Sequence, residues 1–174
     1  QKVGPEKFKS FLEKIGILSD IQFDIEEVAP QKNYNFGKCK LATASFGHGI
    51  TTTLLQLAKG YSIVSNGGLN IKPRLVKKAD FENSKTRILK EEVSEKINPI
   101  LRKIVSTKEG TANFANIHGY EVGGKTGTAQ KSVNGLYSKN KINTFVGIFP
   151  ISKPKYILLV LLDEPKPNKD YIYH

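Results

Sequence analysis

The sequence predicts an α+β fold in which helices come first and an antiparallel, hairpin-connected sheet follows. Apolar residues recur at helical spacing through the first two thirds of the 174-residue chain. The last third changes to short alternating or continuous apolar runs with polar loops between them. Segregation of helices from strands along a chain is typical of α+β domains. We expect one domain, with a helical part at about 1–115 and a sheet part at about 116–174.

Two helices are expected in the first 70 residues. Pro5–Ile15 carries one apolar face, begins with a proline and is followed by Gly16, which ends it. Thr51–Val64 has a broader apolar face and stops at Asn66-Gly67-Gly68. Between these helices, residues 19–44 are polar and mixed, and we expect a long irregular excursion there.

A third helix is expected over Val93–Val105, where apolar residues again recur at helical spacing. Pro99 lies inside this segment and lacks a backbone N–H. We therefore expect the helix to kink there or to split at Asn98.

Three strands are expected in the last third, at Gly119–Gln130, Thr144–Pro150 and Lys155–Leu162. The run Tyr156–Leu162 is apolar at every position. A strand that is apolar on both faces is expected to lie centrally in a sheet, with cover above and below.

Composition places few limits on function. The net charge of +11 suggests nucleic acid, an anionic membrane or a polyanionic cell wall as partners. The lysines are scattered and show no stripe interleaved with aromatic residues, so they are read as solvated faces and no nucleic acid is expected as a partner. A basic nucleic-acid-binding module stays open as the alternative from a different class.

Cysteine and histidine usage predicts neither a disulfide nor a metal site. Cys39 is the one cysteine, and the three histidines (His48, His118 and His174) are too dispersed to form a ligand set. We expect no cofactor. The chain also has no methionine and no apolar run of membrane-spanning length, so we expect a piece of a longer protein whose anchor lies elsewhere.

The segment Gly123–Thr128 contains the candidate site. Its three glycines weaken a strand and are tolerated where something must approach the backbone closely. A period of two places the hydroxyls of Thr126 and Thr128 on one face and Lys125 on the other. Such a strand offers hydroxyl donors, backbone N–H groups and a positive charge to a carboxylate or an oxyanion. A glycine-rich bulge with a surface lysine is the alternative for the motif alone.

The flanks of this segment resemble a known family. Lys-Thr-Gly is one of three sequence marks of penicillin-binding proteins and serine β-lactamases. The longer form Gly119–Lys131 is similar to class B penicillin-binding proteins, the peptidoglycan transpeptidases. Ser45–Ile50, running on to Asn66-Gly67-Gly68, resembles the region after the family's second motif, and Leu161–Lys166 resembles the end of its last strand.

Finer features favour the septum-specific branch of this family, notably Phe46 and the form of the strand ends. The chain departs from the family pattern at Thr53, where proline is usual, and at His48, which we interpret as a structural or surface histidine. A β-lactamase fragment and a penicillin-sensor fragment are the nearest alternatives.

The resemblance implies a fragment of the penicillin-binding transpeptidase / serine β-lactamase-like fold. Family members acylate a serine with the penultimate D-Ala of a stem peptide and pass the acyl group to an amine, and β-lactams mimic that peptide. Carried over, the hydroxyls of Thr126 and Thr128 bind the substrate carboxylate. The backbone N–H of Thr128 forms half of the oxyanion hole, and Lys125 attracts the substrate and bonds to a serine of the second motif. Gly127 completes the substrate-binding segment.

The nucleophile motif, Ser-x-x-Lys, is expected before Lys125, and we assign it to a missing N-terminal part of the same domain. Matches to Ser-x-x-Lys begin at Ser138 and Ser152, and matches to Ser-x-Asn begin at Ser132 and Ser138. All lie after Lys125, in predicted hairpin loops, and the nucleophile motif needs a helical turn to bring its lysine beside the serine. We reject them as chance matches in a chain rich in lysine and asparagine.

The resemblance also implies partners and a location. Stem peptides and β-lactams are the expected ligands, division-complex proteins the expected partners, and the periplasmic face of the bacterial inner membrane the expected location. The strand at 156–162 is expected to lose a neighbour that the missing part supplies, leaving an unpaired edge. We therefore expect the fragment alone to be inactive and to self-associate.

Overall fold

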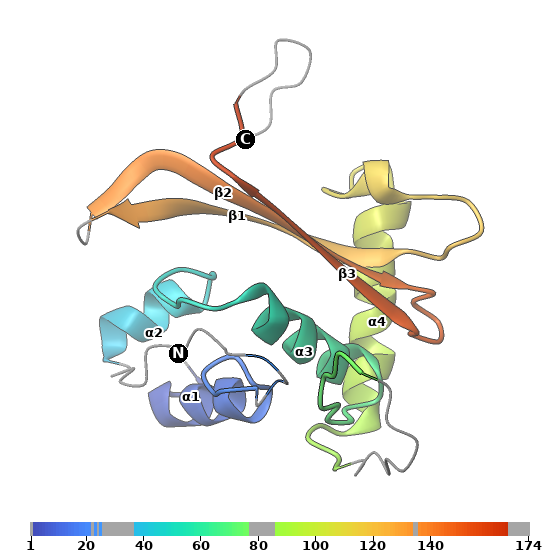
Figure 1. Ribbon diagram of the computed structural model, residues 1–174, viewed down its shortest axis with the longest axis horizontal. Coiled ribbons are helices and arrows are strands. Elements are labelled where there is room, and N and C mark those ends of the chain that lie inside the picture. Colours follow the sequence, from blue (N-terminus) through green and yellow to red (C-terminus); the bar gives the residue numbers. More distant parts are fainter. Residues whose placement is uncertain are drawn as a thin grey trace. The chain divides into compact units, whose positions relative to one another are not determined.

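The computed structural model describes residues 2–21, 23, 25, 37–76, 86–133 and 136–166 (Figure 1). Helices precede a three-stranded antiparallel sheet, which confirms the predicted α+β class. The chain separates into two compact units, Gln1–Ile97 and Asn98–His174. The elements, in chain order, are α1 (Pro5–Lys14), α2 (Lys38–Ala44), α3 (Leu54–Ser65), α4 (Glu91–Ser106), the short 3-10 helix η1 (Asn113–Ala115), β1 (Gly123–Val133), β2 (Leu136–Phe149) and β3 (Tyr156–Asp163).

The first unit has its own apolar core. The buried residues come from α1 and the turn after it, from α2 and from α3, and they are Leu12, Ile15, Ile17, Ala44 and Ile63. Gly16 follows α1 with a φ of 84°, a left-handed conformation that glycine adopts without strain and that ends a helix. The predicted first helix is confirmed to within one residue at its end.

Thr53 is the N-cap of α3 and forms a capping box. Its hydroxyl accepts a hydrogen bond of 3.2 Å from the backbone N–H of Gln56, and the Gln56 side chain accepts one of 2.8 Å from the backbone N–H of Thr53. Gln56 is 2% exposed, and its amide also donates to the carbonyl oxygen of Ser19. The predicted second helix is confirmed, but it begins three residues later because Thr53 is its cap.

The prediction of an irregular excursion over residues 19–44 is wrong at its end. Residues 38–44 form α2, which has no acidic residue in its first turn and no side-chain cap. These missing start signals explain why the sequence pattern did not indicate a helix. Most of the rest of the excursion lies outside the described residues.

The third helix is confirmed, and the predicted split at Asn98 is wrong, because α4 runs without interruption from Glu91 to Ser106. A kink at Pro99 stays a prediction. A proline removes the bond to the carbonyl four residues earlier, here that of Glu95. Both Pro99 and Glu95 are exposed, so water can satisfy the carbonyl that the proline leaves without a helical partner. The helix continues past Pro99 because the hydrogen bond that the proline cannot donate lies on the solvent side of α4.

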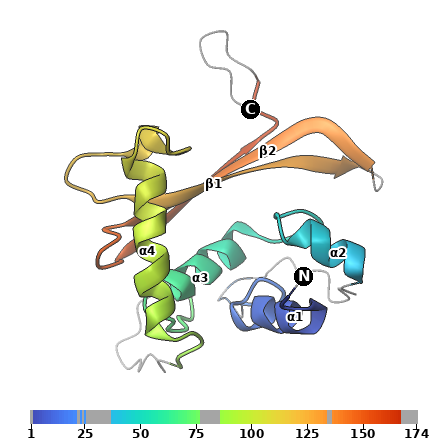
Figure 2. The same ribbon diagram turned by 180° about the vertical axis from the view of Figure 1, so that it is seen from behind.

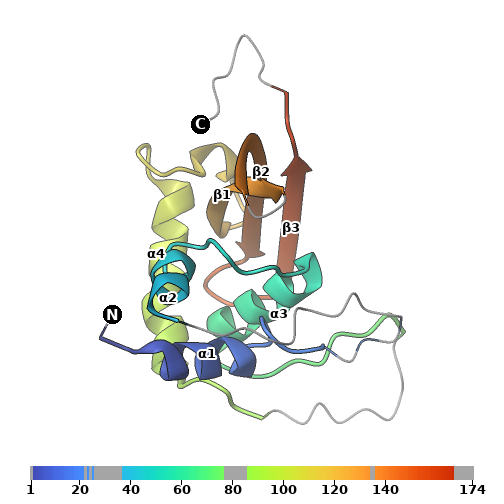
Figure 3. The same ribbon diagram turned by 90° about the vertical axis from the view of Figure 1, so that its left-hand side faces the viewer.

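The sheet has the order β1-β2-β3, with both neighbouring pairs antiparallel (Figure 3). The expectation of a central strand at 156–162 is therefore wrong among the described residues, since β2 is central and β3 lies at an edge. Exposure alternates along the first half of β3, and Leu158 and Leu162 remain 52% and 54% exposed. Within the described part of the chain β3 pairs with β2 alone, so its other edge is unpaired, as expected. β2 begins eight residues earlier than the strand predicted from residue 144.

The second unit is held together around the end of α4. Val105, Ala112 and Val122 are buried together, and Phe145 and Phe149 of β2 pack against them. Figure 2 shows the chain leaving α4, passing through η1 and turning back to enter β1. The connection between helix and strand is therefore part of the core that positions β1.

Candidate functional site

The candidate residues Lys125, Thr126, Gly127 and Thr128 all lie on β1, as predicted. The register pairs Thr126 with Phe145 and Thr128 with Asn143, so the two threonines share one face of the sheet. Lys125 is paired with Val146, on the opposite face. Among the described residues, β1 pairs with β2 alone, so its outer edge is open to an added strand.

Lys125 is exposed, and its ammonium group donates a hydrogen bond of 2.6 Å to the backbone carbonyl oxygen of Thr126. The positive charge thus lies close to the backbone of β1 at Thr126. A lysine head group has three donors, so this bond leaves two for a ligand or a neighbouring side chain.

The glycines of the motif are needed by the sheet itself. A Cβ at Gly124 would lie 2.4 Å from the carbonyl oxygen of Val146, and one at Gly127 would lie 2.6 Å from the hydroxyl of Thr144. Neither space is open, because real Cβ atoms do not approach other atoms so closely. The atoms that approach these glycines closely therefore belong to β2, the central strand. The absence of a side chain at Gly124 and Gly127 lets β1 lie close to β2.

One residue of this site was missed by the sequence analysis. The hydroxyl oxygen of Thr111 lies 3.0 Å from that of Thr126, fifteen positions further along the chain. Thr111 comes from the connection between α4 and β1, where no apolar periodicity or known motif marks it. Only the fold brings it to the threonine face of β1.

The structure gives the rejected serines other roles. Ser138 and Lys141 lie on β2 rather than in a loop, so that part of the prediction is wrong. Three residues apart on a strand, they project to opposite faces, which does not assemble a nucleophile with its base. Ser152 follows β2 and donates a hydrogen bond to a carboxylate oxygen of Glu121. For the remaining match, Ser132-Val133-Asn134, the last residue lies outside the described residues.

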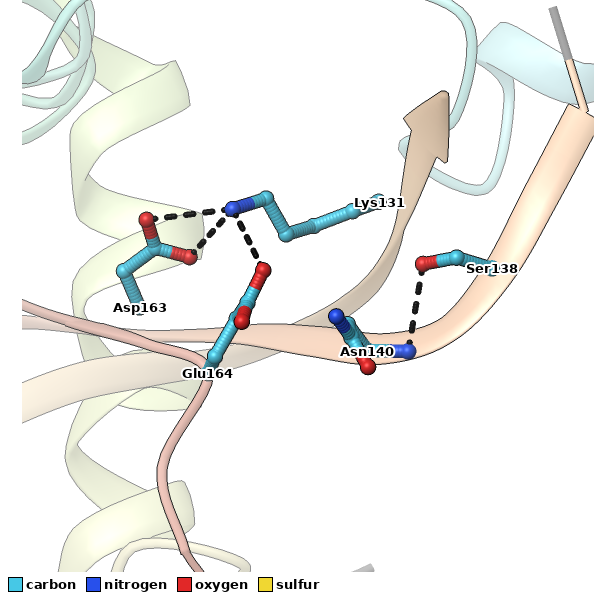
Figure 4. A network of polar contacts seen from close by, with 5 residues as sticks. All are labelled: Lys131, Ser138, Asn140, Asp163 and Glu164. Atoms are coloured by element: carbon cyan, nitrogen blue, oxygen red, sulfur yellow. Dashed lines mark hydrogen bonds and ion pairs between the residues drawn. The ribbon is translucent and has the colours of Figure 1, made fainter. Parts of the chain in front are cut away.

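A polar cluster joins the outer strands beyond the motif (Figure 4). The ammonium group of Lys131 lies 2.9 Å from a carboxylate oxygen of Asp163 and 2.9 Å from one of Glu164. The hydrogen bond from Lys131, followed by one from Asn140, lowers the pKa of Glu164 below its ordinary value. The bond to Glu164, followed by the bond to Asp163, raises the pKa of Lys131.

A hollow of about 420 Å³ lies next to this cluster, lined among others by Asn143, Leu162 and Glu164. Asn143 is the register partner of both Thr128 and Leu162. The hollow therefore adjoins the sheet face that carries the threonines. Its other charged lining residues are lysines, namely Lys139, Lys141 and Lys166.

His48 and Cys39, for which the sequence predicts no chemical role, belong to the first unit. His48 is half-buried in the first unit, with its ring 5.2 Å from that of Phe46 between centroids. Cys39 is exposed and not in a disulfide. Within the described ranges no group of three potential metal ligands occurs, and no helix there is long and apolar enough to cross a membrane.

Comparisons with known proteins show the family to which the chain belongs. Residues 1–173 match the model of the penicillin-binding protein transpeptidase domain. The probable peptidoglycan D,D-transpeptidase PenA of Neisseria meningitidis is 33% identical over 174 residues, covering 98% of this chain and 30% of that protein. PenA of Neisseria flavescens is 36% identical over 135 residues, covering 77% of this chain and 33% of that protein. The chain thus spans about a third of the length of these relatives.

Solved structures show the same fold. Penicillin-binding protein 3 of Mycobacterium tuberculosis, in complex with ampicillin, superposes with a TM-score of 0.83 at 28% identity, covering 95% of this chain and 41% of that one. The transpeptidase domain of penicillin-binding protein 3 from Burkholderia pseudomallei gives a TM-score of 0.80 at 28% identity, covering 92% and 50%.

A family match over nearly the whole chain, with the Lys-Thr-Gly strand at the edge of an antiparallel sheet, establishes the class: the chain belongs to the penicillin-binding protein transpeptidase domain family. Within that family its relatives are class B D,D-transpeptidases of the PenA and penicillin-binding protein 3 type, which confirms the resemblance inferred from the sequence.

Proposed function

We propose that this chain supplies the substrate-binding strand of a serine-type D,D-transpeptidase, which cross-links peptidoglycan stem peptides ending in D-Ala-D-Ala during cell division. The observation that supports this most directly is the open edge of β1, where Lys125, Thr126 and Thr128 offer a cation and two hydroxyls. An extended peptide adds to such an edge through main-chain hydrogen bonds. β-Lactams are proposed to bind at the same place, and a solved structure of a relative, penicillin-binding protein 3 of Mycobacterium tuberculosis, is a complex with ampicillin.

Each residue has a role that its placement supports. The hydroxyls of Thr126 and Thr128 lie on one face and donate to the terminal carboxylate of the peptide. The backbone N–H of Thr128 donates to the oxyanion that forms when the serine attacks the penultimate carbonyl carbon. Loss of one such donor costs roughly 3 kcal/mol of transition-state stabilisation in comparable enzymes. Lys125 supplies the positive charge, and Gly127 lets β1 lie close to Thr144.

The serine nucleophile belongs to another part of the domain in this proposal. In the proposed reaction the serine oxygen forms an ester with the carbonyl carbon of the penultimate D-Ala, and the peptide C–N bond to the terminal D-Ala breaks. The terminal D-Ala leaves as a free amino acid after its nitrogen takes up a proton. An amine of a neighbouring stem peptide then attacks the acyl-enzyme and restores the serine. Since β1 binds but does not attack, the chain alone is proposed to be inactive.

The cellular setting follows from the same family. We propose that the parent protein acts at the periplasmic face of the bacterial inner membrane, held by a single-pass anchor, and meets division-complex proteins there. The missing N-terminal part of the domain is the proposed partner of this chain within the site.

A titration of the ¹⁵N-labelled chain with N-acetyl-D-Ala-D-Ala tests the proposal. We expect the amide signals of Gly124, Gly127 and Thr128 to shift, and the L-Ala-L-Ala peptide to leave them in place. Lys125→Ala weakens the binding, whereas Lys139→Ala, which removes another exposed lysine from the same sheet, does not. Equal responses to both peptides would refute stereospecific recognition by β1.

Labelled penicillin gives a second test. The chain alone is expected to form no covalent adduct, whereas the full gene product that contains it is expected to form one. An adduct on Ser138 or Ser152 of the chain alone would show that the rejected serines are nucleophiles and that the assignment above is wrong.

A further inference from the structure

The first residue of β1, Gly123, lies against Ile151, which belongs to the connection between β2 and β3. A Cβ on Gly123 would lie 2.6 Å from the Cγ1, 2.9 Å from the Cδ1 and 3.0 Å from the Cβ of Ile151. Ile151 is 5% exposed, and its backbone N–H donates a hydrogen bond of 2.9 Å to the carbonyl oxygen of Glu121. Ile151 therefore contacts the chain on both sides of the point where β1 begins.

The segment that Ile151 holds has an unusual backbone. Glu121 has a φ of 47°, in the left-handed region that residues other than glycine seldom adopt. The hydrogen bond from Ile151 fixes the carbonyl group of Glu121, and the hydroxyl of Ser152 donates to its carboxylate. The corner between β2 and β3 thus determines the direction in which the chain enters β1.

The side chain of Ile151 cannot easily give way to a larger neighbour. Two of its three atoms nearest to Gly123 are the Cβ and the Cγ1, which rotation about the Cβ–Cγ1 bond leaves in place. Isoleucine is branched at the Cβ and has few rotamers, and Ile151 is buried. A methyl group at position 123 is therefore expected to move the start of β1 rather than the side chain of Ile151.

The position of Gly123 matters to the site because of the period of the strand. Gly123 and Lys125 are two residues apart, paired with Ile148 and Val146, so they share one face of β1. A shift at Gly123 on this face is passed on to the lysine that supplies the positive charge of the site. In enzymes, a misplacement of about 1 Å can cost about 100-fold in rate.

We propose that Ile151 is a positioning residue of this site, whose fit against Gly123 sets the start of β1 and, through it, the position of Lys125. The inference rests on the function proposed above and adds to it a residue that no sequence motif marks. The fit is one of complementary sizes, with a large residue at position 151 and the smallest at position 123. Alanine at both positions is expected to give nearly the same strand position.

The test measures affinity and stability separately in the full ¹⁵N-labelled chain, by titration with N-acetyl-D-Ala-D-Ala and by urea unfolding. Gly123→Ala is expected to shift the amide signal of Lys125 and to bind the peptide about tenfold more weakly, because the strand is displaced. Ile151→Ala leaves a gap beside Gly123. It is expected to bind about threefold more weakly, because the start of β1 is then correctly placed only part of the time.

The double variant Gly123→Ala/Ile151→Ala tests the complementarity of sizes. The Cβ that remains at position 151 lies 3.0 Å from the new methyl group, so a shift of a few tenths of an ångström is enough to accommodate it. The double variant is therefore expected to bind within about twofold of the wild type, a non-additive result that residues in contact can give. Its Lys125 amide signal is expected to return toward the position in the wild type.

Leu12→Ala is the control for lost stability, because Leu12 is buried in the core of the first unit. This variant is expected to have a lower free energy of unfolding and an unchanged affinity for the peptide. If Ile151 had a structural role only, Ile151→Ala would give the same result, and the proposal would be overturned.

The remaining outcomes also decide the question. A Gly123→Ala variant that folds and binds like the wild type would overturn the proposal and leave the proposed function standing. Losses of affinity that simply add in the double variant would overturn it too, since the two residues would then act independently. If Gly123→Ala does not fold, the double variant must fold and bind at least as tightly as Ile151→Ala. If the wild type does not bind the peptide, the proposed function fails and this inference fails with it.

Discussion

The guanidinium group of Arg102 donates a hydrogen bond of 2.7 Å to the carbonyl oxygen of Val122, the residue directly before β1. The same group donates to the side-chain oxygen of Asn116 at 3.1 Å from each of two nitrogens. One side chain of α4 therefore holds two points of the connection that leads into the Lys-Thr-Gly strand. This arrangement depends on the planar fork of arginine.

Replacing Arg102 by alanine is expected to destabilise the chain by about 1–3 kcal/mol. The reason is that the carbonyl of Val122, which adjoins the buried cluster, then lacks a partner. Arg102→Lys is expected to recover only part of the loss, since a lysine cannot bond to Asn116 and Val122 with the same geometry. Urea unfolding measures the effect. Lys103→Ala, at an exposed neighbour, is the control and is expected to change little.

Replacing Gly124 by alanine is expected to disrupt the pairing of β1 with β2. The new Cβ would lie 2.4 Å from the carbonyl oxygen of Val146, a backbone atom that cannot move without disturbing the sheet. We expect a loss of about 3 kcal/mol in unfolding free energy, at the upper end for overpacking, and weaker binding of N-acetyl-D-Ala-D-Ala. Gln130→Ala alters an exposed side chain on the same strand and is expected to keep both properties. A stable, binding-competent Gly124→Ala variant would contradict the register.

The cluster around Lys131 predicts a pH dependence of stability. The pKa of Glu164 is lowered in the folded state, so its contribution is present above its ordinary value of 4.5 and disappears as the pH falls through the lowered value. The pKa of Lys131 is raised, so its contribution is present below 10.5 and disappears as the pH rises through the raised value. Thermal unfolding of Lys131→Gln is expected to differ from the wild type most between these limits.

Thermal unfolding of Lys131→Gln and the wild type in high salt distinguishes the contribution of this cluster to stability from the contributions of other titrating groups. The carboxylates of Asp163 and Glu164 are exposed and Lys131 is half-buried, so salt is expected to screen the ion pairs in part and to reduce the difference between Lys131→Gln and the wild type. Lys139→Gln is the matched control, because Lys139 is an exposed lysine on the neighbouring strand. A difference that persists unchanged at pH 2 would argue against the ion pairs as its source.

The open edge of β3 predicts that the chain associates with itself. Leu158, Val160 and Leu162 are 41–54% exposed on one face of an edge strand, and an edge of this kind pairs readily with another strand. We expect the apparent mass in sedimentation equilibrium to rise with concentration. Val160→Lys places a charge on that edge and is expected to lower the apparent mass. Phe114→Lys, at an apolar residue that is 86% exposed but not on a strand, is expected to leave it high.

Other outcomes of that experiment are equally informative. A monomeric wild type at all concentrations would refute association through β3. If a longer gene product is monomeric while its β3 amides are protected from exchange, another segment of the same chain covers the edge.

Much of this architecture follows from periodicity. Apolar spacing predicts α1, α3 and α4, since one buried stripe is enough to define a helix. Apolar spacing fails for α2, which lacks start signals. The split expected at Asn98 does not occur, because the carbonyl that Pro99 leaves without a helical partner lies on the solvent side. The length of β2 is underpredicted because its first half, Leu136–Ile142, has the polar run Ser138–Lys141 at its centre. This half pairs with β1, and pairing with β3 begins only at Ile142.

The site is predictable in its motif but not in its surroundings. Lys125, Thr126 and Thr128 follow from a local sequence, and period two places them on the correct faces. Thr111 and Arg102 are not predictable in this way, because their positions depend on how the connection after α4 folds back. The need for Gly124 was inferred, but its cause is the carbonyl of Val146 rather than a ligand.

The cap of α3 has a consequence for the motions of the first unit. Gln56 completes the capping box with Thr53 and also bonds to the carbonyl of Ser19, 37 positions earlier. Fraying of the first turn of α3 therefore also breaks the link to the segment that follows α1. Hydrogen exchange is expected to show the amides near Ser19 and at the start of α3 opening together, as one cooperative event rather than two.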